Sequence, residues 1–249
     1  MTRLFSCLLA ALLLVTVGSL TAYADDCPAG TKKTAYSEGA FHGFRCLDSA
    51  GKTQGKLTLF HQNGKKKVEM EYRDEKKHGK TTVWHDNGQK KMDAEYRNDK
   101  QHGRLTIFDQ TGKKSSEGTY KNGQKHGKHT FWHENGKKKK EENYRDGQGH
   151  GKVIKWYQDG KKEVEEEWRN GKRHGKMGSW HQNGQKYEEV EWRDGALHGK
   201  GIIWHANGKK SAEGVLRGGK KHGKWTHWDT QGKAVKVEDC NMGTCTVVR

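Results

Sequence analysis

The chain has 249 residues, a formal net charge of +17 and a single proline. After the first 24 residues, Leu, Ile, Val and Phe together make up only about 11% of the sequence, which excludes one large conventional globular core. Low hydrophobicity with high net charge is typical of disordered chains. The chain is therefore either unfolded or folds as a thin structure whose few apolar residues are strictly placed.

Residues 1–24 have the parts of a secretory signal peptide. Arg3 supplies the charged start, Leu8–Val17 is the apolar stretch, and Ala22–Ala24 is a small-x-small cleavage site. The apolar stretch is too short for a comfortable membrane span. We expect an exported mature chain, periplasmic or secreted, that begins at about Asp25.

Four cysteines remain after removal of this segment: Cys27, Cys46, Cys240 and Cys245. In an oxidising compartment an even number indicates disulfides, and four cysteines allow three connectivities. No CxxC pair or Cys/His spacing indicates a zinc site.

A period of 24 residues fills most of the mature chain. Glycines carry it, and histidine precedes seven of the eight: Gly55, Gly79, Gly103, Gly127, Gly151, Gly175, Gly199 and Gly223. Five residues after each glycine comes the first aromatic column: Phe60, Trp84, Phe108, Trp132, Trp156, Trp180, Trp204 and Trp228. The second aromatic column is Tyr72, Tyr96, Tyr120, Tyr144, Trp168 and Trp192, which lapses to Leu216. A mostly Arg column follows it directly: Arg73, Arg97, Lys121, Arg145, Arg169, Arg193 and Arg217. Several columns that keep the same 24-residue spacing do not arise by chance, so the region is a repeat array.

Each repeat carries two turn signals. One is the Asn-Gly step, as in Asn183-Gly184, and the other lies near residues 169–172. The segments between turns, such as Lys80–His85 and Gln89–Arg97, are of strand length. We predict an all-β fold, a linear array of 24-residue β-hairpins that forms one antiparallel meander sheet roughly 75 Å long.

The type of the Asn-Gly turn decides which residues share a face. A two-residue loop places the two aromatic columns on opposite faces, whereas a three-residue loop with a Gly bulge places them together. We favour the second arrangement, in which Trp84 shares an apolar face with Met92 and Tyr96, while Asp93 and Glu95 lie on a charged face.

The segment Trp168–Lys176 resembles the MORN repeat, whose signature joins an aromatic residue, an Asn/Asp-Gly turn and a later glycine. The segment from Asn135 to Gly147 is similar to the MORN-variant repeat of bacterial YwqK-type antitoxins. The resemblance covers about Gly55 to Asp239. It implies a ribbon of successive β-hairpins, and it implies little about activity because such repeats act as scaffolds.

An open ribbon needs protected ends. We predict an N-terminal cap at residues 25–54, repeats at 55–239 and a C-terminal cap at 240–249. Because the ends of the ribbon lie beyond disulfide reach of each other, we expect Cys27 to pair with Cys46 and Cys240 to pair with Cys245.

No residue pattern indicates catalysis, a cofactor or a resident metal. Equivalent histidines of successive repeats lie about 9–10 Å apart, too far for a single column to chelate a metal. The carboxylate column (Glu69, Asp93, Glu117, Glu141, Glu165, Glu189 and Glu213) recurs in every repeat, which is typical of a solvated face. Nucleophile-elbow, P-loop and dinucleotide fingerprints are absent from the sequence. We therefore predict that the protein is not an enzyme.

The positive charge indicates binding of a protein partner or of an anionic envelope polymer or lipid. Nucleic acid is a further candidate that no motif supports, and the oligomeric state is left open. The candidate surface comprises Trp84, Trp132, Trp156, Trp180, Trp204, Lys137, Lys138, Lys139 and Lys140. A toxin-neutralising role, as in the antitoxin-type relatives, is the alternative. Histidine protonation in mild acid is expected to strengthen polyanion binding.

Overall fold

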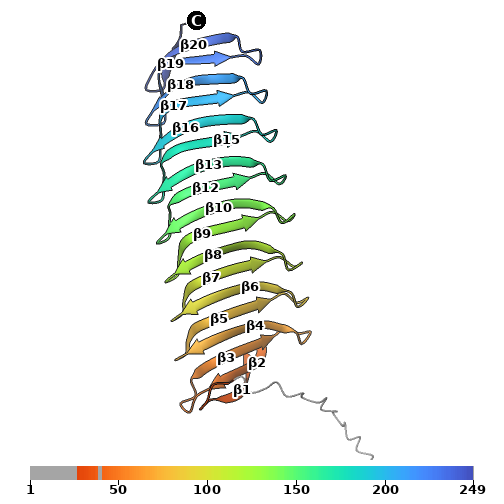
Figure 1. Ribbon diagram of the computed structural model, residues 1–249. Helices are drawn as coiled ribbons and strands as arrows, with labels where there is room; N and C mark the ends of the chain where they lie inside the picture. The colour runs from red at the N-terminus through yellow and green to blue at the C-terminus, as the bar shows by residue number, and fades with distance from the viewer. Residues whose placement is uncertain (1–26, 39–40, 249) are drawn as a thin grey trace, which may run out of the picture.

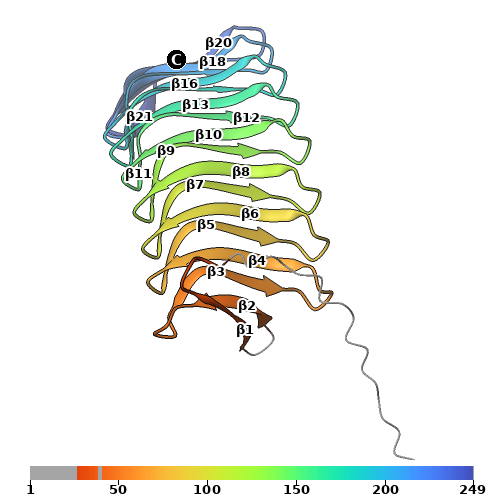
Figure 2. The same ribbon diagram turned by 60° about the horizontal axis from the view of Figure 1, so that its bottom comes forward.

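A computed structural model describes residues 27–38 and 41–248. The predicted signal peptide and the expected mature start at Asp25 lie outside the described residues. The described chain forms one antiparallel sheet of 21 strands, stacked in chain order from the N-terminal to the C-terminal end (Figures 1 and 2). The predicted all-β meander of 24-residue hairpins is confirmed.

The first strands are β1 (Lys32–Glu38), β2 (Phe41–Leu47), β3 (Thr53–Phe60), β4 (Lys66–Arg73), β5 (Lys76–Trp84), β6 (Lys90–Arg97), β7 (Lys100–Phe108), β8 (Lys114–Lys121), β9 (Gln124–Trp132) and β10 (Lys138–Arg145). The later strands are β11 (Gln148–Gly149), β12 (Gly151–Trp156), β13 (Lys162–Arg169), β14 (Lys172–Arg173), β15 (Gly175–Trp180), β16 (Lys186–Arg193), β17 (Ala196–Trp204), β18 (Lys210–Arg217), β19 (Lys220–Trp228), β20 (Ala234–Asn241) and β21 (Thr244–Val247). The short strands β11 and β14 continue into β12 and β15 after a one-residue break.

The Asn-Gly turn has the three-residue loop that we favoured. In the second repeat the amide of His85 donates to the carbonyl of Gln89 at 2.9 Å, and Gly88 has φ +92°. A second irregularity follows at once, because Trp84 pairs with Lys90 whereas Val83 pairs with Met92. Lys91 is therefore an extra, bulged residue, and it reverses the parity that the loop had set.

The predicted sharing of faces is consequently wrong. Thr82 pairs with Asp93, and its hydroxyl donates to the Asp93 carboxylate at 2.9 Å. We call the side that carries the first aromatic column and the carboxylate column the Trp face. The opposite side carries the second aromatic column together with most of the aliphatic residues, and we call it the Tyr face. Trp84 therefore lies opposite Met92 and Tyr96.

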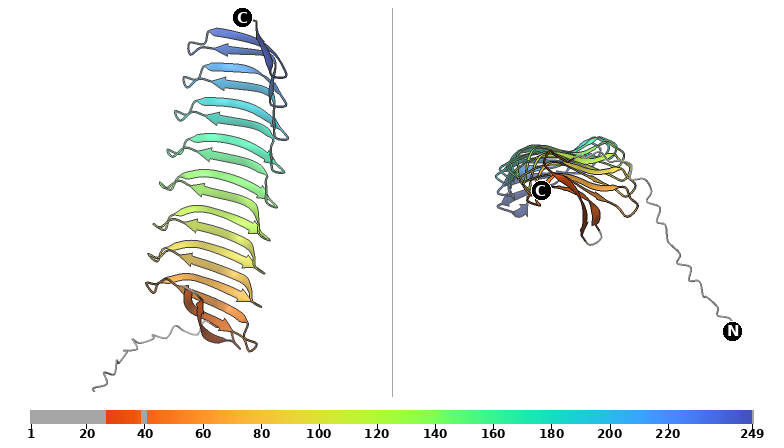
Figure 3. Two further views of the ribbon diagram at one scale, coloured as in Figure 1. Left: turned by 180° about the vertical axis from the view of Figure 1, so that it is seen from behind. Right: turned by 90° about the horizontal axis from the view of Figure 1, so that it is seen from below.

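The second turn of each repeat is a two-residue hairpin loop. Asn122 and Gly123 have φ +52° and +85°, and Lys121 pairs with Gln124 across them. Positive φ at both positions is the type I′ geometry that matches strand twist. Farther along the two strands that this turn joins, at the His-Gly step, the register between the strands shifts by two residues. Seen along its long axis, the sheet is curved rather than flat (Figure 3).

The core lies on the Tyr face, and residues 27–38 and 41–248 place no second layer of structure above it. Val190 is 3% exposed and Trp225 is 4% exposed, and both belong to one cluster of buried residues with Ala212, Leu216 and Cys240. Across the boundary between repeats, a large ring on one strand packs against a glycine on the neighbouring strand. A Cβ on Gly214 would lie 2.3 Å from the Trp225 ring, and one on Gly118 would lie 2.1 Å from His129. Large rings at this position therefore require glycine on the preceding strand.

The disulfides join Cys27 to Cys46 and Cys240 to Cys245, as predicted. The backbone shows no break at residue 240. Cys240 pairs with Cys245 in the register that Tyr96 and Gln101 occupy in the second repeat, and Met242 has the same positive φ as Asn122. Residues 240–245 therefore continue the register of an eighth repeat, with a disulfide in place of a side-chain pair, and the C-terminal cap at 240–249 stays a prediction.

We predict that Trp225→Ala lowers the free energy of unfolding by about 3–5 kcal/mol, because it removes a large buried ring. Val235→Ala is the control, because Val235 lies nearby on β20 but is 58% exposed and should change the free energy by at most about 0.5 kcal/mol. Urea unfolding followed by far-UV circular dichroism measures both. Equal effects of the two variants would show that the Tyr face is not the core.

Candidate functional site

The Trp face is a lattice of rings and paired charges. The Lys162 ammonium lies 5.0 Å from the centre of the Trp180 ring in the next repeat, and it donates to Glu165 at 2.5 Å. The same ring contact recurs between Lys66 and Trp84, Lys138 and Trp156, Lys186 and Trp204, and Lys210 and Trp228, at 5.5–6.0 Å. The carboxylates thus hold lysines between successive rings, where cation–π attraction adds to the ion pair.

A second lysine reaches several of these carboxylates from the neighbouring strand. Lys128 lies 2.7 Å from Glu141, and Lys152 lies 3.3 Å from Glu165. The hydrogen bond from Lys162 lowers the pKa of Glu165, although partial burial opposes it. Most charges on the Trp face are therefore already matched within the protein.

The structure brings only part of the predicted binding surface together. The five tryptophans lie in one half-buried row on the Trp face, with Phe108 between Trp84 and Trp132. The lysine run does not form one patch. Lys138 lies on the Trp face, Lys139 is the exposed bulge, and Lys140 lies on the Tyr face beside Glu142. Lys137 lies in the turn, where its ammonium donates to the carbonyl of Asp159 at 2.7 Å.

The histidines that follow the first aromatic column connect one repeat to the next. Nε2 of His133 lies 2.9 Å from the carbonyl oxygen of Trp156, and Nε2 of His205 lies 2.9 Å from that of Trp228. Tyr157 replaces the histidine in one repeat, and its hydroxyl donates to the carbonyl of Trp180 at 2.6 Å. These side chains hold the turns of successive repeats together.

The Asn-Gly turns form a second ladder that the sequence analysis missed. The Asn135 amide donates to the carbonyl of Gln158 in the next repeat at 2.7 Å, and its oxygen accepts from the Lys137 amide at 3.0 Å. The same contacts recur at Asn63, Asn87, Asn183 and Asn207. The recurrence of asparagine before glycine in five of the eight turns was the available signal, because a turn alone does not require asparagine.

The histidines of the His-Gly column lie at the other edge of the sheet, beside the second turn of the following repeat. Nδ1 of His126 is 3.5 Å from Asp146, and Nδ1 of His174 is 3.5 Å from Asp194. His102 makes the equivalent contact with Asn122 at 3.3 Å.

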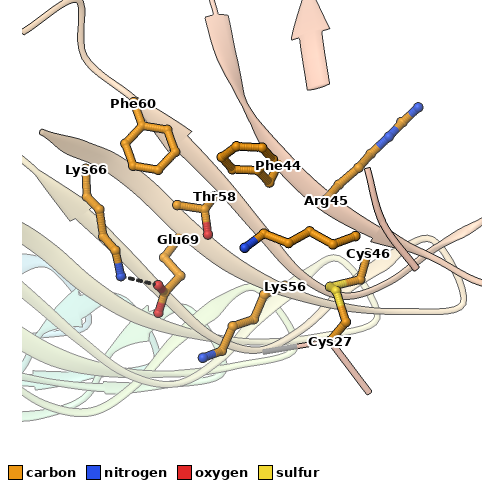
Figure 4. Close-up of a pocket in the computed structure, with 10 residues that line it drawn as sticks. Cys27, Phe44, Arg45, Cys46, Lys56, Thr58, Phe60, Lys66 and Glu69 are labelled. Carbon is orange, nitrogen blue, oxygen red and sulfur yellow. Dashed lines mark hydrogen bonds and ion pairs between the residues drawn. A yellow bond between two sulfur atoms is a disulfide. The ribbon is translucent and has the colours of Figure 1, made fainter. Parts of the chain in front are cut away.

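A small pocket lies where β1 and β2 meet the first repeat (Figure 4). The rings of Phe44 and Phe60 meet edge to face with centres 6.2 Å apart, and the Lys66–Glu69 pair lies beside them at 2.8 Å. The cavity measures about 50 Å³, which is space for a few water molecules. It is too small for the substrate of a typical enzyme.

Among the described residues, three potential metal ligands converge at Glu238, Cys240 and Cys245. The two sulfurs are joined to each other, so neither offers a thiolate. The part of the chain that the structure describes includes no helix with the length and apolarity needed to cross a bilayer.

Comparison with known families agrees with this geometry. The family model described as MORN repeat variant matches five consecutive segments: residues 53–74, 77–98, 101–122, 125–146 and 149–170. Each segment spans most of one hairpin and ends at the first loop residue of the second turn, which is Asp or Asn in all five. No curated protein matches the chain.

We predict that Asn135→Ala destabilises the protein by roughly 1 kcal/mol, because one hydrogen bond between repeats and one within the turn are lost at an exposed site. Glu134→Ala, in the same turn, is the matched control and should be close to neutral. Thermal unfolding compares them, and a neutral Asn135→Ala would show that the ladder does not stabilise the array.

Glu165 on the Trp face and Glu188 on the Tyr face should respond to pH with opposite sign. The pKa of Glu165 is lowered by Lys162, so its stabilising contribution is present above the ordinary pKa of a glutamate and is lost as the pH falls below it. Burial raises the pKa of Glu188 on the Tyr face, so its ionised form destabilises the protein at neutral pH.

We therefore expect Glu165→Gln to lower the stability at pH 7 and Glu188→Gln to raise it, with both differences vanishing in acid. Denaturant titrations of the two variants from pH 7 to pH 3 measure this. Shifts of the same sign at neutral pH would contradict the paired environment of Glu165 and the unpaired, half-buried environment of Glu188.

Proposed function

Because the chain is a MORN-variant repeat protein, we propose that it is a non-enzymatic binding or scaffold module that is exported from the cytoplasm. Proteins built from stacked repeats present long regular surfaces, and binding is their usual role. The observation that carries the proposal is the Trp face, which offers the same ring, lysine and carboxylate in successive repeats along one uninterrupted sheet.

The export part of the proposal rests on the disulfides and on the signal-like residues 1–24. Disulfides persist in oxidising compartments and are rare in the cytosol. The two bridges lie at opposite ends of the sheet, where each fastens a terminal hairpin. They are consistent with a periplasmic or secreted protein.

The proposed partner is a protein or an anionic component of the cell envelope. The net charge of +17 attracts polyanions over a long surface. Toxin neutralisation by surface complementarity is the second candidate, and it rests on the resemblance to antitoxin-type repeats.

The test is affinity capture on the immobilised, disulfide-bonded protein from the envelope fraction of the source cells. We expect a small set of components that are retained at physiological salt and released at about 1 M salt. The variant with Lys138→Gln, Lys162→Gln and Lys186→Gln is the comparison, because it removes charge and ring contacts from the Trp face. We expect it to retain less.

Three outcomes separate the candidates. A retained glycan, lipid or envelope protein supports the first, and one dedicated stoichiometric protein toxin supports the second. Chemical conversion of an envelope component by the pure protein would overturn the non-enzymatic assignment.

A further inference from the structure

The second turns carry a row of exposed basic side chains. The row is Arg73, Arg97, Lys121, Arg145, Arg169, Arg193 and Arg217, and we call it the Arg edge. All seven side chains are exposed, and none makes an ion pair or a side-chain hydrogen bond within the described part of the chain. The lysines of the Trp face differ sharply, because each of the seven that begin β4, β6, β8, β10, β13, β16 and β18 pairs with a carboxylate.

Four of these residues lie directly opposite a second cation. The pairs are Arg73 with Lys76, Arg97 with Lys100, Arg169 with Lys172, and Arg217 with Lys220. Like charges at directly opposed positions destabilise a sheet. The two-residue loops fix these pairs in place, so the chain holds an unfavourable arrangement at the same position of four repeats. A bound anion would relieve it.

Acidic residues reduce the charge at some turns and not at others. Those within the second turns are Asp74, Glu75, Asp99, Asp146 and Asp194. His126 lies beside Asp146 and His174 lies beside Asp194. The turns at Arg169 and Arg217 contain no acid, and each adds a lysine, so the positive charge is most concentrated there.

The Arg edge has the dimensions of a site for a linear polymer. Successive members are two strands apart, which is roughly 9–10 Å, and the seven extend over about 58 Å. Contacts that are individually weak add up when one flexible chain engages many of them. Guanidinium groups suit sulfate and carboxylate oxygens because they are planar, weakly hydrated and bidentate.

The composition of the turns selects among polyanions. The four residues of each second turn include no aromatic side chain, and single-stranded nucleic acids are usually held by stacking on such rings. They include no large apolar side chain to enter a bilayer either, which interfacial membrane binding uses. We propose that the Arg edge binds a linear anionic polysaccharide. This inference rests on the proposed function and names the ligand class and the surface.

Dextran sulfate is the probe, titrated into the full disulfide-bonded protein by isothermal calorimetry at several salt concentrations. Uncharged dextran is the negative control. The test variant carries Arg169→Gln, Lys172→Gln, Arg217→Gln and Lys220→Gln. The matched variant carries Lys91→Gln, Lys113→Gln, Lys209→Gln and Lys233→Gln, which removes the same charge from exposed positions at or near the opposite edge of the sheet, away from the Arg edge.

We expect the test variant to bind roughly 10–100-fold more weakly and with a shallower salt dependence, because fewer counter-ions are released. The matched variant should lose less than about 3-fold by the same reasoning. Circular dichroism establishes that both are folded.

Equal losses in the two variants would show that only net charge matters, and this would overturn the Arg edge as the site. Tighter binding of single-stranded DNA or of phosphatidylglycerol vesicles than of dextran sulfate would overturn the ligand class. If the wild-type protein does not bind dextran sulfate but does capture an envelope partner, this inference is overturned and the proposed function still stands.

Discussion

Each repeat completes its hydrogen bonds and its packing on the next repeat, and the rest of the structure depends on this coupling. A single-layer sheet has no second layer against which to bury a core. Lys162 therefore lies over Trp180, His133 reaches the carbonyl of Trp156, and Trp225 fills the space above Gly214. Every one of these contacts crosses a repeat boundary, so a residue at the wrong spacing would lose its partner. This explains how a chain so poor in aliphatic side chains can hold an ordered fold.

Much of the fold was predictable from the sequence because turns and register determine a meander. Glycine columns in step over seven intervals indicate hairpins of constant length, and the disulfides follow from the separation of the ends. The sharing of faces was predicted wrongly for a specific reason. The bulge at Lys91 lies between Lys90 and Met92, and neither glycine nor asparagine marks it as an irregular position in the sequence. One uncounted residue moves every side chain of the strand to the other face.

The candidate surfaces were predictable only in part. The row of tryptophans follows from the period alone. The lysine run does not form one patch, because the bulge at Lys139 leaves Lys138 on the Trp face and Lys140 on the Tyr face. The Arg column was visible in the sequence, but its lack of ion pairs was not, since only the fold shows which carboxylates each cation can reach. The contrast between the paired Trp face and the unpaired Arg edge separates side chains that hold the array together from those left available to a ligand.

The most direct test of this coupling is to remove one complete period. Deletion of Gly127–His150 takes out 24 residues and joins His126 to Gly151, so every contact between repeats can form again. The account predicts a folded protein with unchanged far-UV circular dichroism per residue and with hydrogen-exchange protection retained in the flanking strands. Deletion of Gly127–Gly149, one residue fewer, should lose that protection around the junction. An unfolded 24-residue deletion, or two deletions that behave alike, would contradict the claim that contacts between repeats in strict register hold the sheet together.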